Sequence, residues 1–386
     1  MAALTLTSLV PTIYQALDTV SREQTGFIRA VGRDSGAERA AKNEVIMSPV
    51  VGPMAAEDLT VGAYPPDYPA QTINNVQMTI SKVRSVPFGI NGEETLGLKN
   101  AGTLDRINAD RISQALRTLS NEIEADLSAL HVNASRAYGT AAGTPFGTAA
   151  DLSDFAGAKR ILEENGAPQS DLHMVLDSSS VARLRGKQSA LFKVNEAGSD
   201  ALLRTGALSD NVQGFALHWS PAVKQAVTAG TVTATVDATG YAVGSTTFTL
   251  TAAAVGLLVG DIITFAGDPN QYVVAGGTLV SGGTLIIAEP GIKVAMSAAA
   301  KAITVIAATN RNMFFYRGAI QLATRAPAMP IGGDDADDVM MVTDPVSGIT
   351  YEFAVYKQKR QVRYEVNLAW GVKAVQPRHI GLLIGA

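Results

Sequence analysis

The sequence predicts an α+β protein that carries an inserted all-β domain, and three features predict this. A stripe of apolar residues recurs at three- and four-residue steps from 103 to 132, which is typical of one long amphipathic helix. Strand and helix patterns alternate from 171 to 220, as in a mixed α/β domain. From 225 to 300 the composition changes to Val, Thr, Gly and Ala, and short strand-like runs between turn residues predict a small β-barrel or sandwich.

The composition excludes several classes of protein. The chain has 386 residues, no cysteine and a formal net charge of −4, from 31 Lys and Arg against 35 Asp and Glu. Without cysteine it has no disulfide framework, thiolate metal site or cysteine nucleophile. Without a basic excess it is not a general DNA-neutralising protein. Only 17% of the residues are charged and 47% are hydrophobic, which predicts a surface covered by other copies of the chain.

No segment of the sequence has the pattern of an export signal or a membrane helix. Polar residues interrupt the apolar start, and no Lys or Arg precedes it. The most apolar later run, 250–259, is shorter than the ~20 residues that a spanning helix needs. We therefore expect a protein that is made and used in the cytoplasm and has no membrane partner.

The first part of the chain predicts helices followed by an extended segment. Apolar groups at helical spacing lie within 9–32, and the polar stretch 32–42 predicts a mobile or surface-lying arm. Residues 43–98 contain six of the 16 prolines and show no helical period, while strand patterns occur at 45–47 and 76–83. An isolated hairpin is at best marginally stable in water. A long two-stranded arm here would therefore pack on something outside its own domain.

Two helices are predicted after this segment. The first runs from Thr103 to about Val132, with Thr103 able to cap a first turn in which the helix dipole favours Asp105. At 1.5 Å per residue it would be roughly 45 Å long, which suits a strut. The second runs from Ser153 to Asn165 and stops at Gly166.

The central segment is predicted to alternate strands and a helix and then to be interrupted. Strands are expected at 173–176 and 215–219, with a helix between them that is capped at 178–180 and runs through 184. The interruption begins after Ser220-Pro221 and ends near Lys301. Strand-like runs within it are 231–236, 246–250, 262–265, 272–274 and 284–287.

The C-terminal part is predicted to be rich in β-structure. A buried strand is expected at 312–316, and a long β tract from 349 to 375 follows a turn at Ser347-Gly348. Alternating residues of this tract would share one face, namely Val362, Tyr364, Val366, Leu368, Trp370 and Val372. An acidic loop at 334–338 precedes the tract, and a basic run at 357–363 alternates like a strand within it.

The charged clusters favour contacts between subunits over chemistry. The acidic loop lacks the spacing of a calcium loop, so we interpret it as a solvated loop or a charge patch that faces another subunit. We interpret the basic run as a solvated strand face or a partner for an acidic neighbour, since one basic strand does not make an acidic protein a strong DNA binder. The candidate inter-subunit contacts are Asp334, Asp335, Asp337, Asp338, Lys357, Lys359, Arg360 and Arg363.

The sequence predicts no catalytic, cofactor-binding or metal-ligating residue. It contains no phosphate-binding loop of the Walker type, no G-x-S-x-G elbow and no H-E-x-x-H motif. The histidines are scattered, and none is expected to pair with another at ligand spacing. We therefore interpret all four as structural residues: His131, His173, His218 and His379.

The order of these parts resembles that of a tailed-bacteriophage major capsid protein, over essentially the whole chain. Residues 259–267 (VGDIITFAG) are similar to a G-D-x-x-T-x-A-G stretch in coat proteins of short-tailed phages that carry an extra β-barrel. Residues 312–323 (NMFFYRGAIQLA) resemble the strand–helix re-entry after that insert. Residues 364–371 (YEVNLAWG) resemble the closing strand of the peripheral domain.

The resemblance implies the tailed-phage major capsid fold and a role for each segment of the chain. The extended loop would lie over a neighbouring subunit, and the long helix would be the spine of the fold. The implied segments are an N-terminal arm (1–42), the extended loop (43–98), a peripheral domain with the spine helix (99–170), an apical domain in two parts (171–222 and 309–345), an inserted β-barrel domain (223–308) and a closing β tract of the peripheral domain (346–386).

The resemblance also implies the function of a non-catalytic shell protein. Hexamers and pentamers of the chain would self-assemble in the host cytoplasm into the icosahedral capsid of a virion, around double-stranded phage DNA. The implied partners are further copies of the chain, a portal protein, packaged DNA in non-specific proximity and a separate scaffolding protein, with no cofactor. Because the arm begins near residue 1, the scaffold is expected to be a separate chain, or this chain to be already processed. Nothing singles out Lys82 near the extended loop for covalent crosslinking, so we expect a non-covalent shell.

Two other hypotheses stay open at this point. An encapsulin-type compartment shell shares the fold, and only the inserted β-domain argues against it. An enzyme such as a β-rich polysaccharide hydrolase would draw its carboxylates from acids such as Asp177, Glu163 or Asp261, but the sequence marks no pair of them.

Overall fold

The computed structural model describes residues 6–23, 26–51, 61–62, 73–187, 211–229, 232, 234–251 and 256–385. The helices are α1 (Val10–Glu23), α2 (Phe27–Ala30), α3 (Gly92–Asn100), α4 (Leu104–Ala129), α5 (Ser153–Glu164) and α6 (Ser178–Lys187), with short 3₁₀ turns η1 (Leu6–Leu9), η2 (Leu130–Asn133), η4 (Arg317–Ala319) and η5 (Pro377–His379). The strands are β1 (Gly32–Ala40), β2 (Val45–Val51), β3 (Ile73–Thr79), β4 (Lys82–Asn91), β5 (Arg136–Gly139), β6 (Leu172–Leu176), β7 (Phe215–Trp219), β8 (Ala234–Val236), β9 (Thr247–Thr249), β10 (Ile262–Phe265), β11 (Gln271–Gly276), β12 (Thr284–Ile287), β13 (Lys301–Val305), β14 (Asn310–Tyr316), β15 (Ile320–Pro327), β16 (Asp338–Thr343), β17 (Thr350–Gln358), β18 (Gln361–Ala374) and β19 (Ile380–Gly385).

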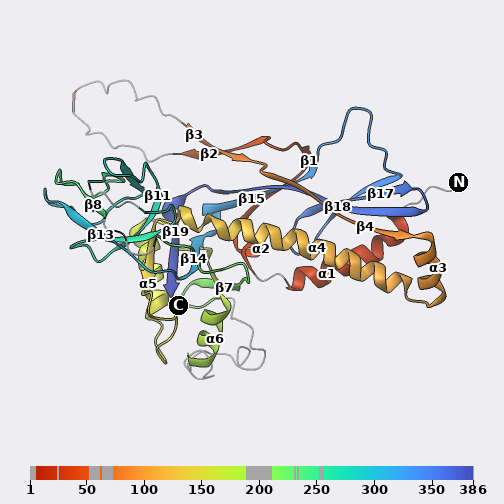
Figure 1. Ribbon diagram of the computed structural model, residues 1–386, viewed down its shortest axis with the longest axis horizontal. Coiled ribbons are helices and arrows are strands. Elements are labelled where there is room, and N and C mark those ends of the chain that lie inside the picture. Colours follow the sequence, from red (N-terminus) through yellow and green to blue (C-terminus); the bar gives the residue numbers. More distant parts are fainter. Residues whose placement is uncertain are drawn as a thin grey trace.

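A six-stranded sheet packs on the long helix α4. The strand order is β1-β15-β18-β17-β16, and β4 pairs with the other edge of β18. Figure 1 shows α4 running lengthwise between these strands and α1. The face of β18 predicted from its alternation is confirmed, because all six of its predicted residues lie in or against the core that α4 also lines. The helices predicted within 9–32 are confirmed too: Ile13, Leu17 and Val20 of α1 are buried in that same core.

The polar stretch 32–42, predicted to be a mobile or surface-lying arm, is mostly strand β1 at the edge of the six-stranded sheet, so the mobile alternative is wrong. β1 pairs in parallel with β15, with Gly32 opposite Gln321. Two ion pairs hold it to the sheet: Arg39 to Glu352 at 2.5 Å and Asp34 to Arg325 at 3.1 Å. The sequence of β1 has no apolar alternation that could predict a strand. It is a strand because β15 offers its backbone a hydrogen-bonding partner, not because its side chains are buried on one face.

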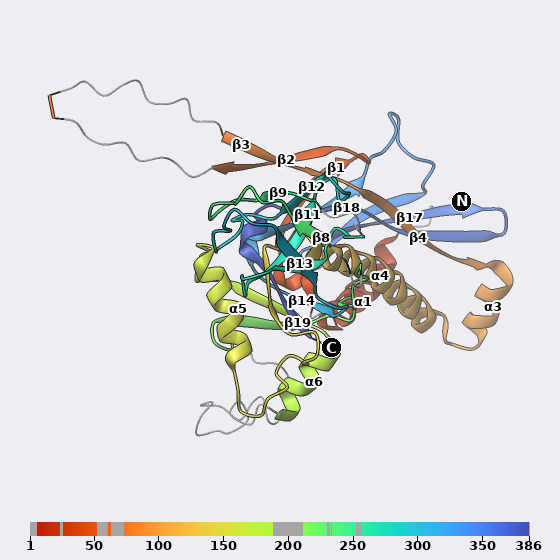
Figure 2. The same ribbon diagram turned by 60° about the vertical axis from the view of Figure 1, so that its left-hand side comes forward.

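The predicted two-stranded arm is confirmed as the antiparallel pair β2 and β3. Figure 2 shows this hairpin projecting away from the rest of the molecule. At its base, two hydrogen bonds of 2.9 Å join its two sides, from Asn43 N–H to the Ile80 carbonyl and from Ile80 N–H to the Glu44 carbonyl. Ser81 N–H next to them donates to the Trp370 carbonyl of β18 at 3.0 Å and so ties the base to the body. Met78 and Ile80 are buried there in a small separate core. The hairpin is therefore anchored at its base only, among the described residues.

The absence of helix predicted for 43–98 is wrong at its C-terminal end, where α3 begins at Gly92. Asn91 accepts a hydrogen bond from Glu94 N–H at 2.7 Å, and the Glu94 carboxylate accepts one from Asn91 N–H at 3.3 Å. This reciprocal capping box starts the helix without any apolar stripe. The cap predicted at Thr103 is also wrong: Thr103 precedes α4, but its side chain makes no capping hydrogen bond.

An eleven-stranded sheet forms the other part of the molecule. Its main order is β7-β6-β14-β19-β5-β11-β10-β13-β8, and β12 and β9 extend it from β11. Helices α5 and α6 cover a second core on its first strands, which includes Phe155, Leu184 and Phe314. The strand–helix–strand alternation predicted here is confirmed by the parallel pairing of β6 with β7. The predicted serine cap of α6 is wrong, because Asp177 accepts the N–H groups of Ser179 and Ser180 instead.

Strands β8 to β13, which lie between β7 and β14 in the sequence, surround a third core. Two of the predicted strands, 262–265 and 284–287, have the bounds observed for β10 and β12. The two ends of this segment lie side by side, where Ala226 N–H donates to the Thr309 carbonyl at 3.2 Å. The segment nevertheless continues the main sheet, because Gln271 and Tyr272 of β11 pair with β5.

The sheets divide the chain differently from the segments implied by the resemblance. β5 and α5, within 99–170, belong to the eleven-stranded sheet and its core, and so does β19, within 346–386. β15, within 309–345, belongs to the six-stranded sheet. The chain therefore crosses between the two parts more often than a linear list of segments indicates.

Exchanging Gly371 for Ala should destabilise the packing of β18 against the base of the hairpin. A Cβ added at Gly371 of β18 would overlap the carbonyl oxygen of Thr79 at the base of β3. We expect Gly371→Ala to lower the free energy of unfolding by about 1–3 kcal/mol, as overpacking does. The matched control is Gly97→Ala on α3, where an added Cβ meets nothing within 4 Å and should stabilise the helix by about 0.5–1 kcal/mol. Urea unfolding measures both, and equal effects of the two changes would contradict the prediction.

Candidate functional site

The projecting hairpin is one candidate functional surface. Among the described strands, β2 and β3 pair only with each other. Val45 and Met47 of β2 are 42% and 60% exposed, although both are large hydrophobic side chains. Such side chains on a hairpin that has no further sheet partner among the described strands are typical of a segment that is completed by another molecule.

The acidic loop and the basic run predicted as contacts meet within one chain. Asp337 pairs with Lys357 at 3.2 Å, and Asp334 accepts the hydroxyl hydrogen of Tyr356. Burial and the neighbouring Asp334 carboxylate raise the pKa of that tyrosine. Asp338 accepts a hydrogen bond of 2.7 Å from Leu6 N–H. Part of the charge predicted to contact other subunits is thus balanced within this one chain.

The basic run 357–363, predicted to be a solvated strand face or a partner for an acidic neighbour, lies on the adjoining ends of β17 and β18 and on the turn between them. Gln358 of β17 pairs with Gln361 of β18, and Arg360 between them has φ +61. Lys359 and Arg360 are exposed at this tip, as is Asp335 in the acidic loop, whereas Arg363 pairs with Glu365 at 2.6 Å. The strand is thus confirmed outside the turn, and the acidic partner is confirmed for Lys357. The two-residue turn at 359–360 was missed because the alternation of charges continues through it.

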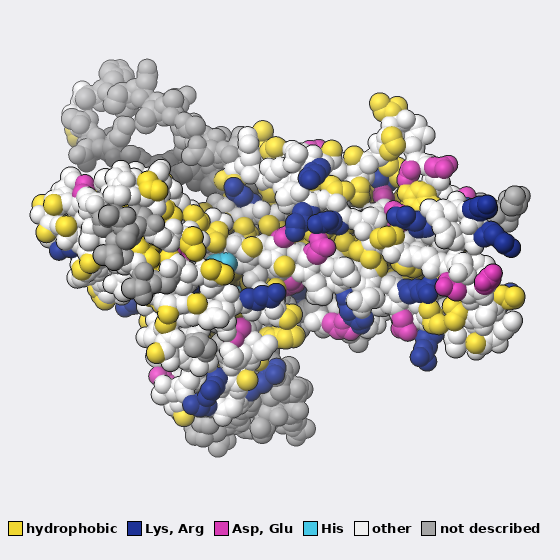
Figure 3. Space-filling model, viewed as in Figure 1, with side chains coloured by type: hydrophobic (Ala, Val, Ile, Leu, Met, Phe, Trp, Pro, Cys, Tyr) yellow, Lys and Arg dark blue, Asp and Glu magenta, His cyan; other side chains and the backbone are white. Residues whose placement is uncertain are grey.

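The loop between β15 and β16 protrudes beside this hairpin. It stands out from the face shown in Figure 3 and carries hydrophobic side chains at its tip. Ile331 there is fully exposed. Hydrophobic side chains and unbalanced charges therefore lie together at this end of the molecule.

A buried carboxylate fastens the long helix to the N-terminal helices. Glu124 of α4 is 7% exposed. It accepts hydrogen bonds from Phe27 N–H at 2.9 Å, from Ile28 N–H at 2.8 Å and from the Ser220 hydroxyl at 2.7 Å. Burial raises the pKa of Glu124, and the three donors oppose that rise. One side chain thus joins α4 to the start of α2 and to the chain segment after β7.

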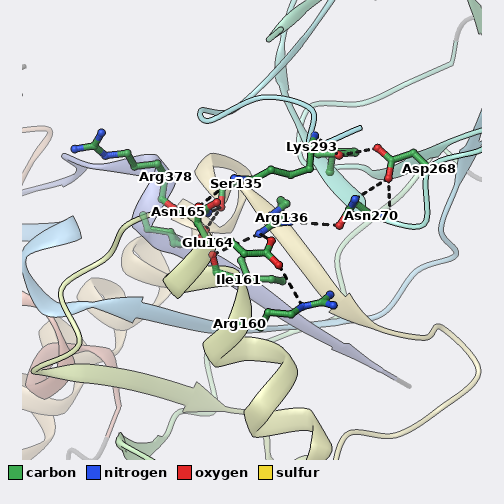
Figure 4. Close-up of polar contacts among 12 residues, drawn as sticks. Ser135, Arg136, Arg160, Ile161, Glu164, Asn165, Asp268, Asn270, Lys293 and Arg378 are labelled. Atoms are coloured by element: carbon green, nitrogen blue, oxygen red, sulfur yellow. Dashed lines mark hydrogen bonds and ion pairs between the residues drawn. The ribbon is translucent and has the colours of Figure 1, made fainter. Parts of the chain in front are cut away.

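A buried arginine joins the body to the inserted strands. Arg136 of β5 is 2% exposed; its Nη2 lies 2.5 Å from the Glu164 carboxylate and its Nη1 lies 3.3 Å from the Asn270 side-chain oxygen. Lys293 donates to the Glu164 carbonyl at 3.1 Å, so the inserted segment contacts β5 through Asn270 and the end of α5 through Lys293 (Figure 4). A cavity of about 380 Å³ opens beside Arg136.

A second buried arginine lies where the inserted segment returns. Arg311 of β14 is 2% exposed, and burial lowers its pKa to about 10, with Asp261 opposing that shift. Asp261 is fully buried, which raises its pKa, and it accepts Leu258 N–H at 2.7 Å and Ala229 N–H at 3.3 Å. Sequence reasoning singled out none of Glu124, Arg136 and Arg311. The one available signal is that Glu124 follows Ser120 by one helical turn on the buried side of α4.

The acids named for the hydrolase hypothesis have structural surroundings. Asp261 and Asp177 each accept backbone N–H groups, and burial of Asp177 is outweighed by its serine hydrogen bonds, so its pKa is lowered. Glu163 is exposed on α5. These contacts fit carboxylates that fix loops and a helix start rather than a catalytic pair.

The expectation that no histidine pairs with another is wrong for His173 and His218. His173 Nδ1 lies 2.9 Å from His218 Nε2. In the parallel register of β6 and β7, His218 lies opposite Val175, which is on the same face of β6 as His173, so the two imidazoles lie on one face of the sheet. Within the described residues, no group of three or more His, Asp or Glu side chains is placed to hold a metal ion. Helices in the described part of the chain are all too short or too polar to cross a membrane.

Stability should fall as the pH drops below the ordinary histidine range. Burial lowers the pKa of His131, His173 and His379, so the folded chain favours their neutral forms. The unfolded chain takes up protons first, near pH ~6.5. The stabilisation is therefore complete above that pH and is lost as the pH falls below it, by up to about 1.4 kcal/mol per pH unit for each histidine that stays neutral.

Urea unfolding across a pH series, with EDTA present, measures this dependence. The raised pKa values of Glu124 and Asp261 act in the opposite direction, at the lower pH where carboxylates titrate. The control is His173→Gln, which should make the dependence shallower. A free energy of unfolding that rises between neutral and mildly acidic pH would contradict the prediction.

The chain matches no protein-family model and no curated protein. Solved structures cover most of it at low sequence identity. The capsid structure of the cyanophage P-SCSP1u covers 94% of this chain and 89% of its own, at 10% identity and a TM-score of 0.45. The mature capsid of bacteriophage PhiM1 covers 94% and 87%, at 10% identity and a TM-score of 0.44. A virus-like particle from Pyrococcus furiosus covers 97% and 98%, at 9% identity and a TM-score of 0.43.

Proposed function

We propose that the chain is the major capsid protein of a tailed bacteriophage, a structural protein without catalytic activity. Its copies assemble as hexamers and pentamers into an icosahedral shell around double-stranded DNA. The observation that carries the proposal is the hairpin of β2 and β3, which projects from the body, has no further sheet partner among the described strands and exposes Val45 and Met47. A neighbouring copy is the surface that completes it.

The body behind the hairpin suits a shell subunit. The six-stranded sheet, α4 and α1 form layers around one core. Glu124 and Arg136 tie helices and sheets that are distant in sequence. A contact made by the hairpin with a neighbour is thus transmitted to a body whose layers are held together by buried polar contacts, which suits a subunit of a rigid shell. The order of segments, which resembles the tailed-phage capsid proteins, supports the same function.

The proposal includes the partners that the resemblance implies. A separate scaffolding protein and a portal protein act during assembly in the host cytoplasm, and packaged DNA lies in non-specific proximity inside the virion. The shell is held without covalent crosslinks. Of the eight charged candidates, Asp335, Lys359 and Arg360 are the exposed ones without a side-chain partner described above, and we propose them as the inter-subunit contacts.

Electron microscopy of the purified chain, with and without its candidate scaffold, tests the function. We expect closed shells tens of nanometres across, and small monodisperse particles under both conditions would contradict the proposal. Extraction of nuclease-protected double-stranded DNA from particles made during infection separates a virion shell from an encapsulin-type compartment. A boiled denaturing gel of the particles should show single chains rather than a ladder.

The inserted segment should be removable, if it is a domain of its own. Gln225 and Asn310 form an antiparallel bridge, so a Gly-Gly turn can join them and replace residues 226–309. We expect a soluble variant with a lower thermal unfolding temperature, because β5 loses β11, and Arg136 loses Asn270. Circular dichroism and thermal unfolding measure the result. Insoluble protein would show that the segment takes part in folding of the body.

A further inference from the structure

Two imidazole rings face each other on neighbouring strands at an edge of the eleven-stranded sheet. β7 is the terminal strand of the sheet order beside β6. His173 Nδ1 and His218 Nε2 are 2.9 Å apart, the ring centroids are 5.1 Å apart and the ring planes differ by 30°. The proposed shell contacts use neither side chain.

A carboxylate fixes the orientation of one ring. His173 Nε2 lies 3.0 Å from Asp171 Oδ1 and 3.2 Å from Arg317 Nε–H. In the tautomer that donates Nε2–H to Asp171, which is the shorter contact, the lone pair of Nδ1 faces His218. Arg317 Nε in turn lies 3.4 Å from Asp171 Oδ2 and holds the carboxylate in place. Histidines that bind metals commonly donate their second ring N–H to a carboxylate in this way.

We propose that His173 and His218 bind one divalent transition-metal ion through Nδ1 and Nε2, with water completing the coordination. Imidazole nitrogens suit Cu²⁺, Ni²⁺ and Zn²⁺, and the usual order of affinities puts Cu²⁺ first. Two nitrogens each ~2.0 Å from one ion lie about 3 Å apart, close to the observed separation. The ion takes the place of the hydrogen bond between the two nitrogens, and the proton on His218 Nε2 moves through solvent to Nδ1 of the same ring, so that both ligands are neutral imidazoles.

The surroundings set the strength of the site. The charged groups described around the pair are Asp171, which precedes β6, and Arg317 in η4. Phe315 of β14 lies against His173, at 6.4 Å between ring centroids. Arg317 Nε is 3.2 Å from His173 Nε2, and its charge opposes the ion while Asp171 favours it. With two protein ligands and this balance of charge, the site is one of moderate affinity that weakens as the pH falls and both rings take up protons.

Calorimetric titration of CuCl₂ into the full chain, made without an affinity tag and freed of metal with EDTA, tests the site near neutral pH. We expect one ion bound per chain. His218→Gln should lower the affinity at least ~10-fold, and Asp171→Asn should lower it ~10–100-fold by freeing the His173 ring. The matched control is His131→Gln, which should bind as the wild type does. Unchanged affinity in His218→Gln, or no binding by the wild type, would overturn the proposal.

Electron paramagnetic resonance of the Cu²⁺-loaded wild type gives a second test that needs no folded variant. Two equivalent nitrogen couplings are expected, and one coupling or none would also overturn the proposal. The inference is independent of shell formation, because the titration uses the unassembled chain. Failure of assembly and failure of metal binding are therefore separate results.

Discussion

A chain whose residues 47–77 are replaced by Asn-Gly is expected to fold and to form no shells. Ile46 and Met78 are register partners in β2 and β3, and a two-residue Asn-Gly turn can join them. The shortened hairpin keeps Met78 in its small core and keeps both hydrogen bonds at the base. It loses the projecting part, which the six- and eleven-stranded sheets do not support. Sedimentation velocity should show monomers or single capsomers, and electron microscopy should show no closed particles.

Two point variants test whether the effect on assembly is specific to the hairpin or follows from the loss of any exposed apolar side chain. Met47→Ser removes a hydrophobic side chain that is 60% exposed on the hairpin, and it should raise the concentration needed for assembly about tenfold, which corresponds to ~1.4 kcal/mol. Leu96→Ser removes one that is 63% exposed on α3, and it should leave that concentration unchanged. Shells of normal size from the shortened chain would disprove the role that we propose for the hairpin.

Glu124→Ala is expected to lower the free energy of unfolding by about 3–5 kcal/mol, because it leaves two buried backbone N–H groups and the Ser220 hydroxyl without their hydrogen-bond acceptor. Domains of ordinary stability unfold with about 5–15 kcal/mol, so this loss is a large part of the total. Glu124→Gln retains one acceptor oxygen and should lose less, about 1–3 kcal/mol. Urea unfolding of the unassembled chain measures both variants.

Glu122→Ala on the same helix is the matched control. Glu122 pairs with Arg84 at 3.4 Å, and the two side chains are 37% and 57% exposed. Because exposed ion pairs contribute only about 0–1 kcal/mol, this change should leave the urea midpoint nearly unchanged. If Glu122→Ala and Glu124→Ala lowered stability equally, the three hydrogen bonds of Glu124 could not be the cause of its effect.

Elements whose own residues determine their conformation could be predicted from the sequence. The bounds of β10 and β12 match the prediction because turn glycines enclose their apolar runs on both sides. The long helix and the buried face of β18 follow from one stripe and one alternation. α3 was missed although the Asn91 and Glu94 capping box stands in the sequence, because no apolar period accompanies it.

Features that depend on which strands become neighbours could not be predicted. β1 is a strand because β15 offers it a backbone partner, and its own residues give no sign of this. His173 and His218 are 45 residues apart in sequence and meet only through the register of β6 and β7. The partners of Arg136 come from α5 and from the inserted segment, so its pairing likewise follows from the tertiary structure.

The position of β19 also has a consequence for synthesis on the ribosome. Its residues, 380–385, lie between β14 and β5 and pair with both. β14 is translated long before β19, and until then its hydrogen-bonding groups on that side have no partner from this strand. Domains generally fold as units during synthesis, so this sheet stays incomplete until residue 385 has emerged from the exit tunnel. A ribosome-bound chain from which β19 has not yet emerged therefore lacks the strand that joins β14 to β5.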